Sequence, residues 1–243
     1  EIQSRLLTMR VSEAGKSSEA RVVVNAEATP GYESSEDAPL LYDENLKDVP
    51  LLYTVADDQA VAVNAVPSID WMPLGVVSDG AGSSSDENKT EADSSSETMV
   101  SLQLKGLDNL SAPLYLYDAE SKQYQVLRDD EAVEIAANEH GRYFLTTTRG
   151  TTGIDSSTLD ENSVKVFSPT SGLIVVSSPE AILKKVEVYT VDGKLVATKL
   201  LQAANTVSIP VEASAVYIVK VTTALGNNEK SNPQVITRKL SIR

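Results

Sequence analysis

Residues 186–200 read VEVYTVDGKLVATKL, two runs rich in Val, Tyr, Thr and Leu that are separated by Asp192-Gly193. Asp-Gly between two such runs is a strong signal of a β-hairpin, because both central residues of a type I′ turn need positive φ. The pattern predicts a two-residue turn that places Tyr189 opposite Val196 and puts Leu195 on the core face. We therefore expect this stretch to build the fold and to carry no catalytic group.

Similar short runs recur along the chain, separated by Gly, Pro, Asn or Asp, whereas a helical period is hard to find. Turns spaced by roughly 8–12 residues are typical of a β-sandwich or barrel. The fold class that we predict is all-β. The expected strands are Arg5–Val11, Ala20–Asn25, Leu51–Val55, Ala60–Ala65, Met72–Val77, Met99–Leu104, Leu114–Asp118, Gln123–Leu127, Ala132–Ala136, Arg142–Thr148, Val164–Phe167, Gly172–Ser177, Lys184–Val191, Lys194–Leu201, Asn205–Ile209, Ala215–Thr222 and Gln234–Ile242.

Charge divides the chain into two parts. Residues 1–153 hold 27 acidic and 11 basic side chains, a net charge of −16, whereas residues 154–243 hold 8 acidic and 10 basic, a net charge of +2. The step coincides with a stretch rich in Gly, Ser, Thr and Asp, which is typical of a linker. We expect two β-sandwich domains in tandem, immunoglobulin-like or jelly-roll-like: residues 1–150, a linker over 151–163, and residues 164–243.

One segment differs from the rest of the first domain. Residues 78–98 hold seven serines and six carboxylates against one lysine, with no large apolar side chain before Met99. Such a composition buries too little surface to offset the entropy of ordering, so we expect this segment to be mobile. It is either a loop within the first domain or a linker between two smaller units, and we favour the loop because strand patterns continue on both sides.

Composition excludes several kinds of chemistry. The chain has no cysteine and one histidine, so disulfides, thiolate sites and multi-histidine metal sites are absent. A formal net charge of −14 disfavours nucleic acid, since phosphate neutralisation needs clustered Lys and Arg. No phosphate-binding loop and no nucleophile elbow occur. We predict a protein that is not an enzyme, with no catalytic residue, no cofactor and no metal.

Two single residues are worth weighing. His140 lies in Asn138-Glu139-His140-Gly141-Arg142, which we interpret as a solvated turn that enters a strand. Trp71, the only tryptophan, is flanked by Ile69 and Met72. We favour core or edge packing for Trp71, and its alternative role is an aromatic platform for a ligand.

The order of features after Val164 resembles the C-terminal sorting domain of proteins exported by the type IX secretion system of the Bacteroidetes. The opening VKVFSP (164–169) and SGLIVV (171–176), the hairpin already quoted, the strand AVYIVKV (215–221) and the basic run RKLSIR (238–243) follow the order of that family. The candidate sorting residues that the resemblance implies are Pro169, Gly172, Tyr189, Gly193, Lys194, Val216, Tyr217, Arg238, Lys239 and Arg243.

The resemblance implies a secreted protein or one on the outer-membrane cell surface, held there without a transmembrane segment. Residues 164–243 would be the export address, which secretion machinery proteins recognise through an exposed strand edge and the basic end. The first domain would be a passenger or spacer, and the chain would be part of a longer secreted protein.

Two other functions stay open at this stage. The first domain could be an adhesin-like module that binds a surface glycan or protein ligand, with Trp71 as the platform. Alternatively, both domains could be accessory to a secreted hydrolase, because two facing carboxylates suffice for glycoside hydrolysis and the chain has 35 acidic residues.

Overall fold

The structure is a computed structural model that describes residues 5–42, 48–79, 97–149, 163–225 and 233–242. Within these residues the secondary structure is almost entirely strand, with one 3-10 helix at Leu107–Asn109. The all-β prediction is confirmed. Most of the expected mobile segment 78–98 and nearly all of the expected linker 151–163 lie outside the described residues.

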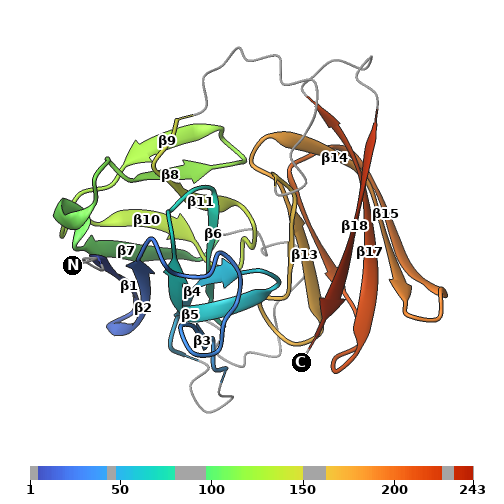
Figure 1. Cartoon of the computed structure of the whole chain (residues 1–243), viewed down its shortest axis with the longest axis horizontal. Coiled ribbons are helices and arrows are strands. Elements are labelled where there is room, and N and C mark those ends of the chain that lie inside the picture. The colour runs from blue at the N-terminus through green and yellow to red at the C-terminus, as the bar shows by residue number, and fades with distance from the viewer. Residues whose placement is uncertain (1–4, 43–47, 80–96, 150–162, 226–232, 243) are drawn as a thin grey trace, which may run out of the picture.

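The first half, residues 5–149, forms one curled sheet (Figure 1). Its strand order is β10-β7-β1-β2-β5-β4-β6-β11-β8-β9, and the short β3 also pairs with β5. The strands are β1 (Arg5–Glu13), β2 (Lys16–Val24), β3 (Ala38–Pro39), β4 (Leu51–Ala56), β5 (Gln59–Val66), β6 (Met72–Val77), β7 (Met99–Lys105), β8 (Tyr115–Asp118), β9 (Gln123–Val126), β10 (Val133–Ala136) and β11 (Tyr143–Thr146).

Alternation of apolar and polar residues explains how this sheet curls over its own core. In β1 the side chains of Leu7, Met9 and Val11 are fully buried, while their neighbours lie at least partly open to solvent. Because successive strand residues face opposite sides, such a strand has one apolar face. The core that these faces enclose includes Leu102 of β7 and Leu145 of β11, which lie in opposite halves of the strand order.

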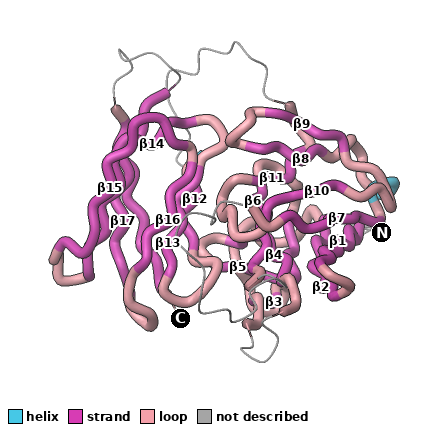
Figure 2. The backbone as a smooth tube through the Cα atoms, turned by 180° about the vertical axis from the view of Figure 1, so that it is seen from behind, coloured by secondary structure: helices cyan, strands magenta, loops and turns pink. Residues whose placement is uncertain are grey.

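The C-terminal unit, residues 163–242, consists of two sheets (Figures 1 and 2). A three-stranded sheet has the order β12-β13-β16, and a four-stranded sheet has the order β15-β14-β17-β18. The strands are β12 (Lys165–Phe167), β13 (Leu173–Ser177), β14 (Ala181–Thr190), β15 (Leu195–Ala204), β16 (Thr206–Pro210), β17 (Val216–Leu225) and β18 (Gln234–Ser241). Buried residues of both sheets form one apolar cluster, to which Ile174 and Val219 belong.

The β14–β15 hairpin exists as predicted, but its turn does not. Gly193, at φ 86°, donates its N–H to the Thr190 carbonyl at 3.0 Å, and the Thr190 N–H reaches the Lys194 carbonyl at 2.9 Å. This is a three-residue connection in which glycine alone takes positive φ, a common alternative to the type I′ turn. Tyr189 therefore faces Leu195 rather than Val196, with a bulge between Val188 and Tyr189.

The changed register also corrects the predicted core face. Leu195 was expected to be in the core, but it is 51% exposed, because the bulge moves it to the face that carries Tyr189. Val186 and Val188 are fully buried, as predicted.

An apolar interface joins the first half to the C-terminal unit. Tyr53 and Val55 of β4 cluster with Phe167 of β12 and Val175 of β13, and both Tyr53 and Phe167 have no exposed surface. A hydrogen bond beside this cluster also joins the two parts: the Ser168 N–H donates to the Asp58 carbonyl at 3.1 Å. The two parts therefore share a dry core, although the sheets remain separate.

Candidate functional site

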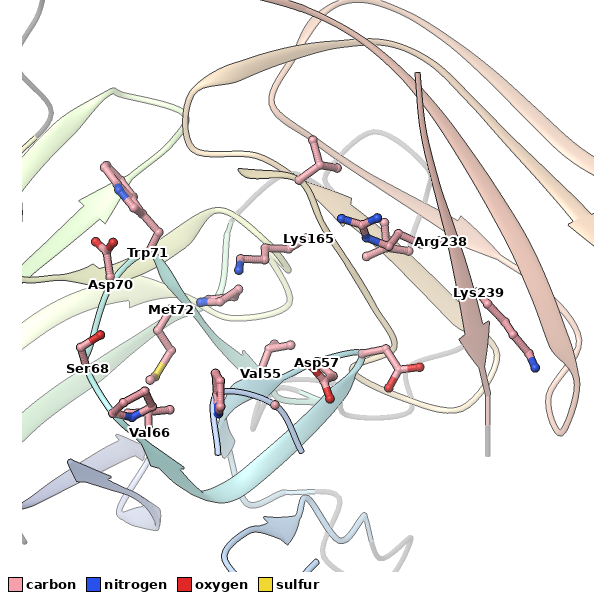
Figure 3. A pocket seen from close by; sticks show the side chains of 17 residues that line it. Val55, Asp57, Val66, Ser68, Asp70, Trp71, Met72, Lys165, Arg238 and Lys239 are labelled. Carbon is pink, nitrogen blue, oxygen red and sulfur yellow. The ribbon is translucent and has the colours of Figure 1, made fainter. Parts of the chain in front are cut away.

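A cleft of about 800 Å³ lies where the first half meets the C-terminal unit (Figure 3). The first half supplies the turn between β4 and β5 and the loop between β5 and β6. The C-terminal unit supplies β12 and the middle of β18. The floor is apolar, with Val55, Val66, Met72, Val164 and Val166 all buried.

The wall from the first half carries three carboxylates, those of Asp57, Asp58 and Asp70. Asp57 accepts the Tyr32 N–H at 2.8 Å, which holds its side chain in place. Asp70 Oδ1 accepts the Thr148 hydroxyl at 3.0 Å. Ionised carboxylates only accept hydrogen bonds, so this wall favours ligand groups that donate.

The wall from the C-terminal unit carries cations. Lys165 of β12 and Arg238 of β18 point into the cleft (Figure 3). Arg238 pairs with Val219, whose side chain is buried, so Arg238 lies on the inner face of its sheet. Ammonium and guanidinium groups only donate, so this wall favours ligand groups that accept.

Lys239 follows Arg238 in sequence and lies on the other face of β18. Lys239 is among the residues that line the cleft, but the end of its side chain points away from Arg238, because successive residues of a strand face opposite sides (Figure 3). The expected basic end is therefore not a single patch: Arg238 and Lys239 lie on opposite faces of β18, and Arg243 lies outside the described residues.

Trp71 lies at the opposite end of the cleft from Arg238, and its indole is directed away from Arg238 (Figure 3). Its ring meets that of Tyr117 edge-on, with centroids 5.2 Å apart, and those of Tyr124 and Phe144 at 6.2 and 6.4 Å. Its backbone has φ 47°, a conformation that bulky residues rarely adopt. The packing we favoured is thus present, whereas the role of Trp71 as a ligand platform stays a prediction for a side chain that is only partly buried.

His140 is not the solvated turn residue that we expected. It is only 8% exposed, and its Nδ1 lies 2.8 Å from the phenol oxygen of Tyr53. Burial lowers the pKa of His140 to about 4 and raises the pKa of the Tyr53 phenol. Both groups are therefore neutral at pH 7.

The candidate sorting residues do not converge on one site. Tyr189, Gly193 and Lys194 lie at the tip of the β14–β15 hairpin, whereas Pro169 and Gly172 flank the turn between β12 and β13. Val216 and Tyr217 lie on β17, where Tyr217 is 2% exposed and donates its hydroxyl to the Glu212 carbonyl at 3.0 Å. Several of them support the fold: Gly172 and Gly193 take positive φ in turns.

Sequence reasoning missed most of the cleft. Asp57 and Asp58 stood out only as a turn between two strand patterns, and Lys165 only as part of the opening strand of the second domain. Nothing in the spacing of these residues along the sequence indicates that the turn with Asp57 and Asp58 lies beside the strand with Lys165. Only the alternation along β18 could have separated Arg238 from Lys239.

Two kinds of structural feature are absent from the described residues. No group of three or more His, Asp or Glu side chains there is arranged to hold a metal ion. No helix in the same ranges is both long enough and apolar enough to cross a membrane.

Comparison with known proteins gives one match. A family described as a domain of unknown function (DUF8694) matches residues 152–237, which covers most of the C-terminal unit. No curated protein and no solved structure matches the chain. The matched segment is thus similar to a family whose description assigns no activity.

Proposed function

We propose that the C-terminal unit is an export address of the type IX sorting class and that the first half is its passenger. The two sheets of this unit and their shared core fit a sandwich module, and the single sheet of the first half, curled over its core, fits a second, sandwich-like domain. The protein is then not an enzyme and is secreted or displayed on the outer-membrane surface, where the secretion machinery is its partner.

The observation that carries this proposal is the apolar surface of the β14–β15 hairpin. Of the nine large hydrophobic residues that are exposed in the described ranges, four lie within residues 191–200: Val191, Leu195, Val196 and Leu200. Exposed apolar residues gathered in one place mark a surface for another protein, whereas scattered ones need no explanation. β15 is also an edge strand, and it lies on the side away from the first half (Figures 1 and 2).

The test uses the whole chain in a host with type IX machinery, with an epitope inserted at the exposed Ala14-Gly15 turn. We expect the epitope to reach the cell surface. The double substitution Leu195→Ser and Leu200→Ser should leave it in the periplasm.

The matched control is Val235→Ser on β18, which is 51% exposed at the opposite edge of the same sheet. This variant should still reach the surface. Retention of the unsubstituted chain in the periplasm, or normal export of the double variant, contradicts the proposal.

A further inference from the structure

We propose that the cleft between the two parts binds an oligosaccharide and that both parts contribute to the binding site. This inference does not depend on the export role, since it concerns the opposite side of the C-terminal unit from β15. Its elements are the two unlike polar walls, the apolar floor and the tryptophan at one end.

The size and shape of the cleft fit an extended ligand. Its volume of about 800 Å³ falls in the range of roughly 300–1,000 Å³ that ligand pockets occupy. Trp71 and Asp70 lie at one end, Arg238 lies at the other, and Lys165 lies between them (Figure 3). A ligand that touches both ends must therefore be elongated.

The two walls select the chemistry of that ligand. One wall offers the carboxylates of Asp57, Asp58 and Asp70, which accept, and the other offers the cations of Lys165 and Arg238, which donate. A hydroxyl both donates and accepts, so a chain of hydroxyl-bearing rings can satisfy both walls at once. A ligand of one charge sign would be attracted by one wall and repelled by the other.

The cations have enough donors for this role. A guanidinium has five N–H donors and an ammonium has three, so Arg238 and Lys165 can bind a ligand while holding a protein partner. The planar guanidinium also presents two parallel N–H donors, whose spacing matches two hydroxyl oxygens on adjacent carbons of a sugar ring.

Trp71 supplies the apolar part of the site. A sugar ring has a C–H face that packs on an aromatic surface while its hydroxyls point to polar groups. The edge-on contacts with Tyr117, Tyr124 and Phe144 hold the indole in place before a ligand arrives. A backbone in the positive-φ region costs about 1–3 kcal/mol, and residues that keep such strain cluster at ligand sites.

The site exists only while the two parts are docked. Asp58 belongs to the turn that accepts the Ser168 N–H, and Phe167 packs on Tyr53 one residue away from that contact. The dry core beneath therefore sets the spacing of the two walls, which pre-organises the site for its ligand.

The experiment is a glycan array of neutral and acidic oligosaccharides probed with the whole chain, followed by calorimetry on the saccharide that binds. Arg238→Met removes the guanidinium but keeps the apolar stem, and Lys220→Met is its matched control, since Lys220 is an exposed residue of the neighbouring strand β17 and is not part of the cleft lining. We expect Arg238→Met to weaken binding at least tenfold and Lys220→Met to change it less than twofold.

Two further variants test the other end of the cleft. Trp71→Ala should weaken binding at least tenfold, and Asp70→Asn, which keeps the shape of the side chain, should weaken it as well. Because Trp71→Ala could loosen the aromatic cluster, the thermal midpoint of each variant is measured alongside. If Trp71→Ala fails to fold, Asp70→Asn alone decides the role of that end.

The proposal is overturned if no saccharide binds the unsubstituted chain, if Lys220→Met weakens binding as much as Arg238→Met, or if Asp70→Asn leaves binding unchanged. A zwitterionic tripeptide is tested in the same calorimeter. Binding of the tripeptide in place of saccharides would assign the cleft to peptides and overturn it too. Surface display of the epitope-tagged chain is a separate readout, so failure of one proposal leaves the other standing.

Discussion

His140 shows how the tertiary surroundings of a single residue set its chemistry. Its side chain belongs to the first half, while its backbone carbonyl accepts the Thr206 hydroxyl of the C-terminal unit at 3.0 Å. Next to it, the Gly141 carbonyl accepts the Ser177 hydroxyl. A five-residue turn that looks solvated in sequence is thus one of the contacts between the two parts.

The buried imidazole predicts a pH-dependent stability. An unfolded His140 takes up its proton near pH 6.5, whereas the folded one does so only near pH 4. Between these values the unfolded state binds more protons, so the free energy of unfolding falls as the pH is lowered from 6.5 to 4, by roughly 3 kcal/mol. Above pH 6.5 this residue contributes no pH dependence.

Urea unfolding of the native chain and of His140→Gln at pH 4, 5, 6 and 7 checks this. Glutamine can still accept the Tyr53 hydroxyl but does not titrate, so the difference between the two curves isolates the histidine from the many carboxylates. The difference should shrink steadily as the pH falls. A constant difference across the four values would mean that His140 titrates normally in the folded protein.

Two glycines with the same backbone conformation predict different costs. A Cβ on Gly141, at φ 79°, would lie 2.6 Å from Ser177 Cβ and 2.8 Å from Thr206 Oγ1, whereas one on Gly193, at φ 86°, would meet nothing within 4 Å. Gly193→Ala should cost about 1 kcal/mol from backbone strain alone. Gly141→Ala should cost about 2–4 kcal/mol, because steric overlap in a packed core adds to that strain. Chemical unfolding of both variants measures the difference, and equal costs would argue against a tight interface.

At the scale of one element, β15 combines an exposed apolar surface with features that prevent uncontrolled pairing. It is an edge strand, and an edge presents unpaired backbone groups to other chains. A bulge interrupts its pairing with β14 near Val196. Lys199 lies opposite the buried Val186, so it is a charge on the inner side of the edge, and such charges disfavour edge-to-edge association.

Lys199→Val should therefore cause self-association. The substitution leaves residues 195–201 as an uncharged run with high β propensity, which is the composition of aggregation-prone segments. Light scattering and size-exclusion chromatography at increasing protein concentration should show larger species than for the native chain. The control is Lys220→Val, because Lys220 is an exposed lysine on the interior strand β17. This variant should show the same size distribution as the native chain.

At the scale of the whole molecule, the dry interface predicts that both parts unfold together. Tyr53 and Phe167 face each other from the two parts with ring centroids 6.4 Å apart and no exposed surface. Separating the parts would expose these rings and the buried valines beside them. Buried aromatic and aliphatic side chains each contribute roughly 1.5–3 kcal/mol, so this interface is a substantial share of a typical folding free energy.

Trp71 is a convenient probe of this coupling, because it is the only tryptophan and belongs to the first half. Ile174→Ala removes a fully buried side chain from the core of the C-terminal unit and should destabilise the protein by about 2–5 kcal/mol. We expect the thermal midpoint of Trp71 fluorescence to fall by several degrees. Leu200→Ala, at a site 78% exposed in the same unit, should leave it nearly unchanged. An unshifted midpoint for Ile174→Ala would show that the parts unfold independently.

Local patterns predicted the elements well and their partners poorly. The strand Met72–Val77 has the predicted bounds, and the strand expected over Gly172–Ser177 begins one residue later. The pairing of β2 with β5 in parallel and the bridge between Gln59 and Ser168 had no sequence signal. The pattern that predicts a strand is local, because side chains two residues apart share one face. These pairings join residues far apart in the chain, so loop closure and packing determine which strands pair.

The sequence by itself determined that this protein is made of short strands and that Asp192-Gly193 lies in a turn. Only the tertiary structure decided that His140 is buried, that Leu195 faces solvent, and that Arg238 and Trp71 line opposite ends of one cleft. The physical reason is range: alternation and turn propensity act over a few residues. Burial, pKa and the two walls of a cleft depend on which distant surface packs against each residue.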